Sequence, residues 1–481
     1  MIYSPVENGV TTLLFITIMK IKNVFTFAFI AGIIIGSLYG IDHYVKFFAD
    51  PQSKVSIILL WLGIILLLGK LSGVVERLGQ AAVLGELLVG LLLGNATLIG
   101  ITFLEPMKVD PIIAALSRLG TVILFFQAGL VSDIRTIFKL WKESLILAVL
   151  GIVFSFGLFY FILPFLIPHL DSFVRVFLAF ALSPTGTGVT ARVLQDLGKM
   201  NLKETQLILS AGAVDNILMF IILAVLMAYN ASGGIHHSIV SVLLIKVIAL
   251  LTGIVLFCLY ALPVITAFLA RVYPSRSLKF ALALGITLIS SYLAHSVGIS
   301  PIIGAFVAGL AMSPSYFHHF KPSPTILSFQ EIILQNCDTI SPAVDKQYRK
   351  KVKEATYRDL EDMLTAPAFL LVAVFFVVTG MGVPFSLFTN IPLLQSALII
   401  LIFTFVTKMA ASAIVERKLI SVTGIGMSPR GVTTLVYATA GKNFHIITPE
   451  LYALIVLTVI LTTLVTPIML SQFLKRGQSS K

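Results

Sequence analysis

The sequence predicts an all-α polytopic membrane protein with about fourteen transmembrane helices. Three observations predict this class: 58% of the 481 residues are hydrophobic, only 12% are charged, and the mean hydropathy is +1.01. A water-soluble chain of this length needs far more charge to cover its surface. The composition therefore argues against a cytosolic enzyme, a nucleic-acid-binding protein and a disordered chain, and we expect no catalytic residues.

The predicted spans are mostly apolar segments of roughly 17–25 residues, long enough to cross the hydrocarbon layer as helices. In chain order they cover residues 24–41, 54–75, 82–103, 117–134, 144–168, 174–194, 205–229, 238–257, 278–296, 300–313, 366–388, 391–414, 420–440 and 449–474. The first lacks a clear small-residue cleavage site, so we expect a retained span rather than a signal peptide. The tenth is the shortest and directly follows the ninth.

These spans divide the chain into a main domain at 54–475, an N-terminal extra span and loop at 1–53, and a short tail at 476–481. A charged insert at 314–365 interrupts the main domain. Its acidic and basic residues balance, and we expect it to be cytoplasmic and partly helical, either on the membrane surface or as a solvated loop.

Basic residues give the orientation. Most Lys and Arg fall on the side of the N-terminus, whereas the other side holds Lys46, Lys54, Lys108, Arg118, Arg175, Lys246 and Lys442. Because cytoplasmic loops carry the excess of Lys and Arg, both termini are expected in the cytoplasm, with the protein in the inner membrane if it is prokaryotic. This asymmetry also means that the net charge of +12 needs no anionic partner.

Three short patterns recur in the same order in both halves of the chain. Residues 85–91 match 304–310, residues 125–130 match 375–381 with one residue's slip, and residues 183–186 match 428–431. Each pair links a span to the one seven places later. Seven is an odd number, so the partners run in opposite directions, as in an inverted-topology repeat of a secondary transporter.

The sixth and thirteenth spans contain helix-breaking residues at corresponding positions. Ser-Pro-Thr-Gly-Thr-Gly occupies 183–188, and Gly-Ile-Gly-Met-Ser-Pro-Arg-Gly occupies 424–431. Proline removes a backbone donor and glycine tolerates unwinding, so free carbonyls and helix ends become available to bind an ion. Simple proline kinks are the alternative, but two interruptions in register favour a binding site.

Two charged residues lie deep in apolar spans and are candidates for a functional pair. Asp215 is near the middle of the seventh span, and Lys408 lies in the twelfth. Burial opposes the charged form of the carboxylate while a nearby ammonium favours it, so contact with Lys408 would let Asp215 take up and release a proton. The alternative is a structural salt bridge that fixes two helices.

Further polar residues surround the predicted breaks. Arg430 can either cap exposed carbonyls or pair with an acid, and Glu86 is the favoured acid, in a structural role. Thr185 and Thr187 supply neutral oxygens beside the first break, and Asn216 adds a side-chain carbonyl next to Asp215. Mixed oxygen ligands of this kind suit a hard monovalent cation bound at Asp215. Cys258 and Cys337 offer no metal-ligand spacing, so no cofactor is expected.

Several of these segments together resemble the monovalent cation:proton antiporter superfamily, in its sodium/proton exchanger-like and Kef-type branch. The matching segments are residues 80–94, 181–198, 304–311, 375–380 and 427–431, and the likeness spans roughly 55–475. The resemblance implies the sodium/proton antiporter fold, with two crossed broken helices. It also implies a homodimer, in which dimerising scaffold helices near 54–103 and 278–313 support a mobile core near 117–229 and 366–440.

Carried over residue by residue, Asp215 matches the first acid of the family's paired-acid motif, and Lys408 matches the lysine that bonds it. Asn216 stands where the ion-binding aspartate usually lies, and Val432 replaces a glutamate that often follows Pro-Arg-Gly. These departures leave a single deep carboxylate. The simplest scheme is that Asp215 alternates between a proton, Lys408 and a bound cation.

We therefore expect a secondary active transporter in a lipid bilayer that exchanges sodium or potassium for protons by alternating access, one for one and without net charge movement. Two alternatives remain. The fold can serve as a sensor or regulator without antiport, as Asn216 and Val432 suggest. It can also carry an organic anion or other solute, with Lys408 and Arg430 binding its negative group.

Overall fold

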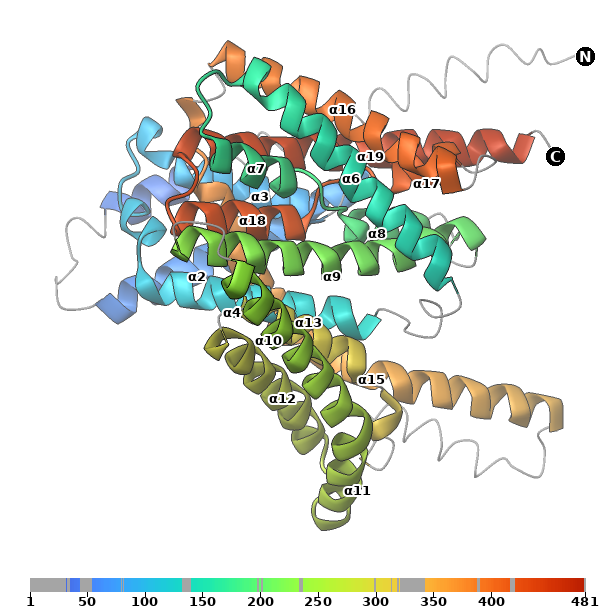
Figure 1. The fold of residues 1–481 in the computed structure, drawn as a ribbon. Coiled ribbons are helices and arrows are strands. Elements are labelled where there is room, and N and C mark those ends of the chain that lie inside the picture. Colours follow the sequence, from blue (N-terminus) through green and yellow to red (C-terminus); the bar gives the residue numbers. More distant parts are fainter. Residues whose placement is uncertain are drawn as a thin grey trace, which may run out of the picture.

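A computed structural model describes residues 32, 35–43, 54–78, 80, 82–131, 140–196, 199, 202–232, 237–297, 300–312, 314–317, 320, 342–386, 390–415 and 420–479. Helices dominate this part of the chain, and no strand occurs within it (Figure 1). The expected all-α class is confirmed.

The helices form a bundle of long and short elements. The α-helices are α2 (Lys54–Leu71), α3 (Ala82–Gly94), α4 (Pro111–Val131), α6 (Trp141–Leu166), α7 (Ser172–Ala181), α8 (Thr187–Asp196), α9 (Lys203–Ser232), α10 (His237–Leu256), α11 (Leu262–Val272), α12 (Arg276–Ser296), α13 (Pro301–Ala311), α15 (Pro342–Met381), α16 (Ile391–Val415), α17 (Ile420–Gly426), α18 (Val432–Asn443) and α19 (Pro449–Ser479). Short 3-10 helices are η1 (Ser72–Leu78), η2 (Ala96–Ile99), η3 (Glu105–Lys108) and η5 (Pro314–Phe317), and η4 (Phe257–Ala261) is a π-helix.

Among the described residues, nine helices are long and apolar enough to cross a membrane, and α3, α7 and α13 are shorter apolar helices. The chain is therefore a multi-pass integral membrane protein. The predicted spans agree with these helices in most places, and both predicted breaks are present. The first predicted span, 24–41, lies largely outside the described residues.

The third and eighth predicted spans end at clearly different residues in the structure. The third, expected to reach residue 103, ends as α3 at Gly94, after which the chain forms η2 and turns at Gly100 with a left-handed φ of 85°. The eighth, expected to end at 257, continues through η4 and α11 to Val272. The wider π turn precedes Pro263, so the helix tolerates the missing proline donor and does not end there.

The helix α15 is 40 residues long and joins the second half of the predicted insert to the eleventh span. Residues 342–365 of the insert are helical, as expected. Only Asp362–Met381 has the hydropathy of a membrane span, so the preceding turns continue the same helix beyond the apolar segment (Figure 1).

Glycines let several helices approach backbone to backbone. A Cβ on Gly129 of α4 would lie 2.2 Å from the carbonyl oxygen of Phe306 on α13, and a Cβ on Gly309 would lie 2.2 Å from that of Phe126. Gly90 of α3 and Gly380 of α15 meet in the same way, through the carbonyls of Val377 and Leu87. These glycines belong to the recurring sequence patterns, so small residues at helix contacts account for part of that recurrence.

The helices pack in two groups. One contains α2, α3, α4, α12, α13 and α15, and the other contains α6, α7, α8, α9, α16, α17, α18 and α19. The expected division into core and scaffold assigns α4 and α15 to the mobile core, yet both pack mainly on the first group. The division itself stays a prediction.

Candidate functional site

Two helices of the second group are interrupted and touch at their interruptions. The first interruption separates α7 from α8 at 182–186, and the second separates α17 from α18 at 427–431. The Gly186 amide donates to the carbonyl of Pro429 at 2.5 Å. A Cβ on Gly186 would lie 2.7 Å from the Gly431 nitrogen, so this approach requires glycine. The predicted crossing of two broken helices is confirmed, and the simple-kink alternative is wrong.

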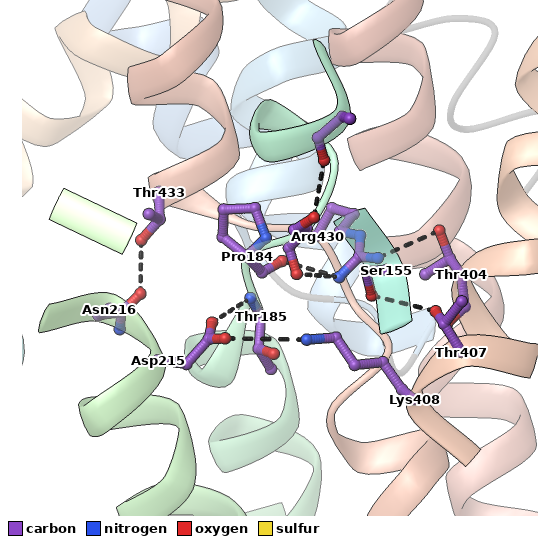
Figure 2. Close-up of polar contacts among 12 residues, drawn as sticks. Ser155, Pro184, Thr185, Asp215, Asn216, Thr404, Thr407, Lys408, Arg430 and Thr433 are labelled. Atoms are coloured by element: carbon purple, nitrogen blue, oxygen red, sulfur yellow. Dashed lines mark hydrogen bonds and ion pairs between the residues drawn. The ribbon is translucent and has the colours of Figure 1, made fainter. Parts of the chain in front are cut away.

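Arg430 lies within the crossing and has no solvent exposure. Its Nη1 donates at 2.9 Å to the carbonyls of both Ser183 and Pro184, and its backbone amide donates to Thr462 Oγ1 at 3.0 Å. These two carbonyls belong to the non-helical stretch that follows α7, where no helical amide pairs with them. Arg430 therefore supplies the donor for the carbonyls exposed at the break (Figure 2).

The predicted pair of Arg430 with Glu86 is wrong. Glu86 on α3 forms an ion pair with Lys70 of α2 at 2.7 Å. Glu86 belongs to the other group of helices, where α3 packs on α2, η1 and α15, whereas the carbonyls freed at the break lie directly beside the guanidinium. Proximity within the fold, which span hydropathy does not encode, decides both partners.

Asp215 projects from α9 into the space between the first break and Lys408 (Figure 2). It has no solvent exposure, and its Oδ2 accepts the Thr185 amide at 2.7 Å. Its Oδ1 lies 3.8 Å from Nζ of Lys408, which is only 1% exposed. The structure thus brings together the two predicted charges, at an ion-pair distance longer than a hydrogen bond.

Three buried polar atoms at this place have no hydrogen-bond partner within the described part of the chain. They are Thr185 Oγ1, Asp215 Oδ1 and Lys408 Nζ. Buried polar groups are normally paired, so three unpaired atoms together mark this place as a candidate binding site. Two of the three are oxygens with the hardness that a proton or a monovalent cation requires. Among the described residues, no group of three or more His, Cys, Asp or Glu side chains is placed so that it could hold a metal ion.

The two remaining predicted ligands are placed differently. Asn216 turns its amide oxygen toward α18, where it accepts the Thr433 hydroxyl at 2.6 Å (Figure 2). The oxygen expected beside Asp215 is therefore already engaged. Thr187 is the first residue of α8, and its methyl group packs against Gly212 of α9. A Cβ on Gly212 would lie 1.8 Å from that methyl group.

Several hydroxyls near the site were not predicted. Ser155 Oγ on α6 lies 3.1 Å from Thr407 Oγ1 on α16, and Thr404 Oγ1 lies 3.5 Å from Nη2 of Arg430. Thr404, Thr407 and Lys408 follow each other at helical spacing, so one polar stripe of α16 faces the site. That spacing is visible in the sequence and was the signal that could have found them.

The sequence is similar to known proteins over most of its length. Residues 63–337 and 340–476 match the family model described as "Sodium/hydrogen exchanger, transmembrane". The chain is 29% identical over 416 residues to the Na(+)/H(+)-K(+) antiporter GerN of Bacillus cereus, covering 85% of this chain and 94% of the relative. It is 28% identical over 414 residues to a Na(+)/H(+) antiporter of Enterococcus hirae, covering 84% and 94%.

A solved structure is similar in fold. The sodium proton antiporter MjNhaP1 of Methanocaldococcus jannaschii superposes with a TM-score of 0.59 at 16% identity, covering 86% of this chain and 99% of that one. At this identity the match concerns the fold alone.

Proposed function

The chain belongs to the sodium/hydrogen exchanger family, and we propose that it is a secondary active transporter that exchanges sodium or potassium for protons across its membrane. The similar antiporters cover most of the chain and most of their own length, which supports carrying this activity over. The observation that carries the proposal is the fully buried carboxylate of Asp215 at the crossing of two broken helices.

In this proposal Asp215 has three competing partners. Without a cation, its carboxylate faces the Lys408 ammonium at 3.8 Å. A proton neutralises the carboxylate, and a cation replaces the ammonium, with Thr185 Oγ1 as a neighbouring ligand that has no other partner among the described atoms. Because one carboxylate cannot hold a proton and a cation at once, their exclusion couples the two flows.

The arrangement of the protein in the membrane is part of the proposal. We place both termini in the cytoplasm, since basic residues concentrate in loops on that side. We also propose a homodimer and an elevator-like movement of the crossed helices, as the family resemblance implies. The membrane is the inner membrane if the source is prokaryotic.

The experiment is collapse of a pH gradient in proteoliposomes on adding sodium, potassium or lithium. Wild type should respond to at least one cation, and Asp215→Asn should lose the response because it cannot release a proton. The matched control is Asp171→Asn, since Asp171 is an exposed carboxylate that caps α7 through the Phe173 amide, and asparagine caps equally well.

An Asp215→Asn variant as active as wild type would remove that residue from the mechanism. If wild type responds to none of the three cations, the sensor interpretation takes precedence. The organic-anion alternative receives less support, because Nη1 of Arg430 is already engaged by two backbone carbonyls.

A further inference from the structure

Gly151 of α6 lies directly beside the ammonium group of Lys408. A Cβ built on Gly151 would be 3.0 Å from Lys408 Nζ, 3.5 Å from its Cδ and 3.8 Å from its Cε. The three nearest atoms to this Cβ therefore all belong to the Lys408 side chain. By contrast, a Cβ on Gly157 of the same helix would meet nothing within 4 Å.

The helix α6 is held in register against α16, so it cannot simply move aside. Ser155 Oγ lies 3.1 Å from Thr407 Oγ1, one turn from Gly151 on α6 and next to Lys408 on α16. At the other end of the contact, Ser396 Oγ donates to the Leu166 carbonyl at 3.5 Å. Added volume at residue 151 must therefore be accommodated by the lysine side chain, which is flexible, rather than by the helix.

The position of the Lys408 ammonium matters because it has no hydrogen bond to hold it among the described atoms. It faces Asp215 Oδ1 at 3.8 Å in a fully buried setting, where the attraction between two charges changes steeply with distance. We propose that Gly151 is a positioning residue of the exchange reaction. Its missing side chain lets Lys408 reach Asp215, and so sets how strongly the ammonium competes with a cation for that carboxylate. This inference rests on the proposed function.

The test compares Gly151→Ala with Gly157→Ala in the proteoliposome exchange assay, using the cation that wild type transports best. Displacing the ammonium weakens a competitor of the cation, so the apparent KM for the cation should fall about threefold or more in Gly151→Ala. The ammonium also competes with the proton for Asp215, so inhibition of exchange by acid should begin at a higher pH in Gly151→Ala, while Gly157→Ala keeps the wild-type KM and pH profile. An unchanged or raised KM in a folded Gly151→Ala protein overturns the inference.

A double-mutant cycle shows whether the effect acts through the lysine. In a Lys408→Gln background, Gly151→Ala should have no further effect, because the shorter side chain leaves the space open. If Gly151→Ala alone does not fold, the double variant should recover folding, and failure to recover counts against the inference.

The same cycle separates this inference from the exchange function. If wild type moves no cation, the proposed function fails on that result, and Gly151 is judged on thermal unfolding in detergent. Gly151→Ala should then lower the melting temperature of the wild-type protein, but it should cause no decrease in the Lys408→Gln background. A loss of equal size in both backgrounds overturns the role of Gly151.

Discussion

At the scale of single residues, the site separates two cations that look equivalent in the sequence. Arg430 and Lys408 are both buried in apolar segments near one acid. The guanidinium donates to two backbone carbonyls through Nη1, whereas the ammonium has no hydrogen bond among the described atoms. A bonded cation holds structure and an unbonded one can exchange partners, so we assign the structural role to Arg430 and the competing role to Lys408.

Replacing Arg430 tests this division. Arg430→Ala leaves the carbonyls of Ser183 and Pro184 without their donor, which should lower the free energy of unfolding by about 3 kcal/mol. Arg430→Lys should lose less, because one ammonium can still reach a carbonyl. Thermal unfolding of the purified variants measures both changes.

Lys408→Gln is the comparison for that experiment. It removes a cation that makes no hydrogen bond within the described chain, so its melting temperature should fall less than that of Arg430→Ala. An Arg430→Ala protein as stable as wild type would mean that the carbonyls find other donors and that the cap is dispensable.

At the scale of helices, close approach replaces the hydrophobic effect as the source of packing. Lipid is as apolar as a leucine side chain, so helices associate through contact of their backbones at small residues. The reciprocal contacts of Gly129 and Gly309 fix α4 against α13 in this way. The same holds for the two glycines at the crossing, where a side chain on either would separate the broken helices.

Gly309→Ala should therefore destabilise the protein, because its Cβ would meet the Phe126 carbonyl, which is backbone and cannot rotate away. The expected loss is about 1–3 kcal/mol, typical of overpacking. Gly285→Ala is the matched control, since a Cβ at Gly285 of α12 would have nothing within 4 Å. Equal melting temperatures of the two variants would contradict this account of helix packing.

At the scale of the whole molecule, the charge carried per cycle follows from counting charged groups at the crossing. Asp215 is the only acid there among the described residues, and Arg430 stays bonded in the proposed scheme. Exchange of one cation for one proton on one carboxylate moves no net charge. Transport should therefore be insensitive to membrane potential, whereas one net charge per cycle would couple about 2.3 kcal/mol per 100 mV.

The dependence of transport on membrane potential can be measured as uptake of labelled cation at clamped potentials. The potential is set by an ion that the protein does not carry. Asn216→Asp is the informative variant, since it adds a second carboxylate while its oxygen can still accept the Thr433 hydroxyl. We expect potential dependence to appear only in the variant. Potential-dependent uptake by wild type would require another titrating group.

The sequence by itself determined the membrane class, most helix positions, both helix breaks and the residues worth examining at the site. It could do so because a bilayer imposes rules that act along the chain: spans need a minimum apolar length, interruptions need proline or glycine, and buried charges are costly enough to be rare. Asp215, Lys408 and Arg430 stand out for that last reason alone.

Only the tertiary structure decided which groups meet. Glu86 binds Lys70, Arg430 binds the carbonyls of the broken helix, Asn216 binds Thr433, and Gly151 makes room for Lys408. Each of these pairs joins different helices, at a depth and on a face set by how the helices cross. Hydropathy and spacing describe one helix at a time, so they carry no information about the atoms that a neighbouring helix brings within a few ångströms.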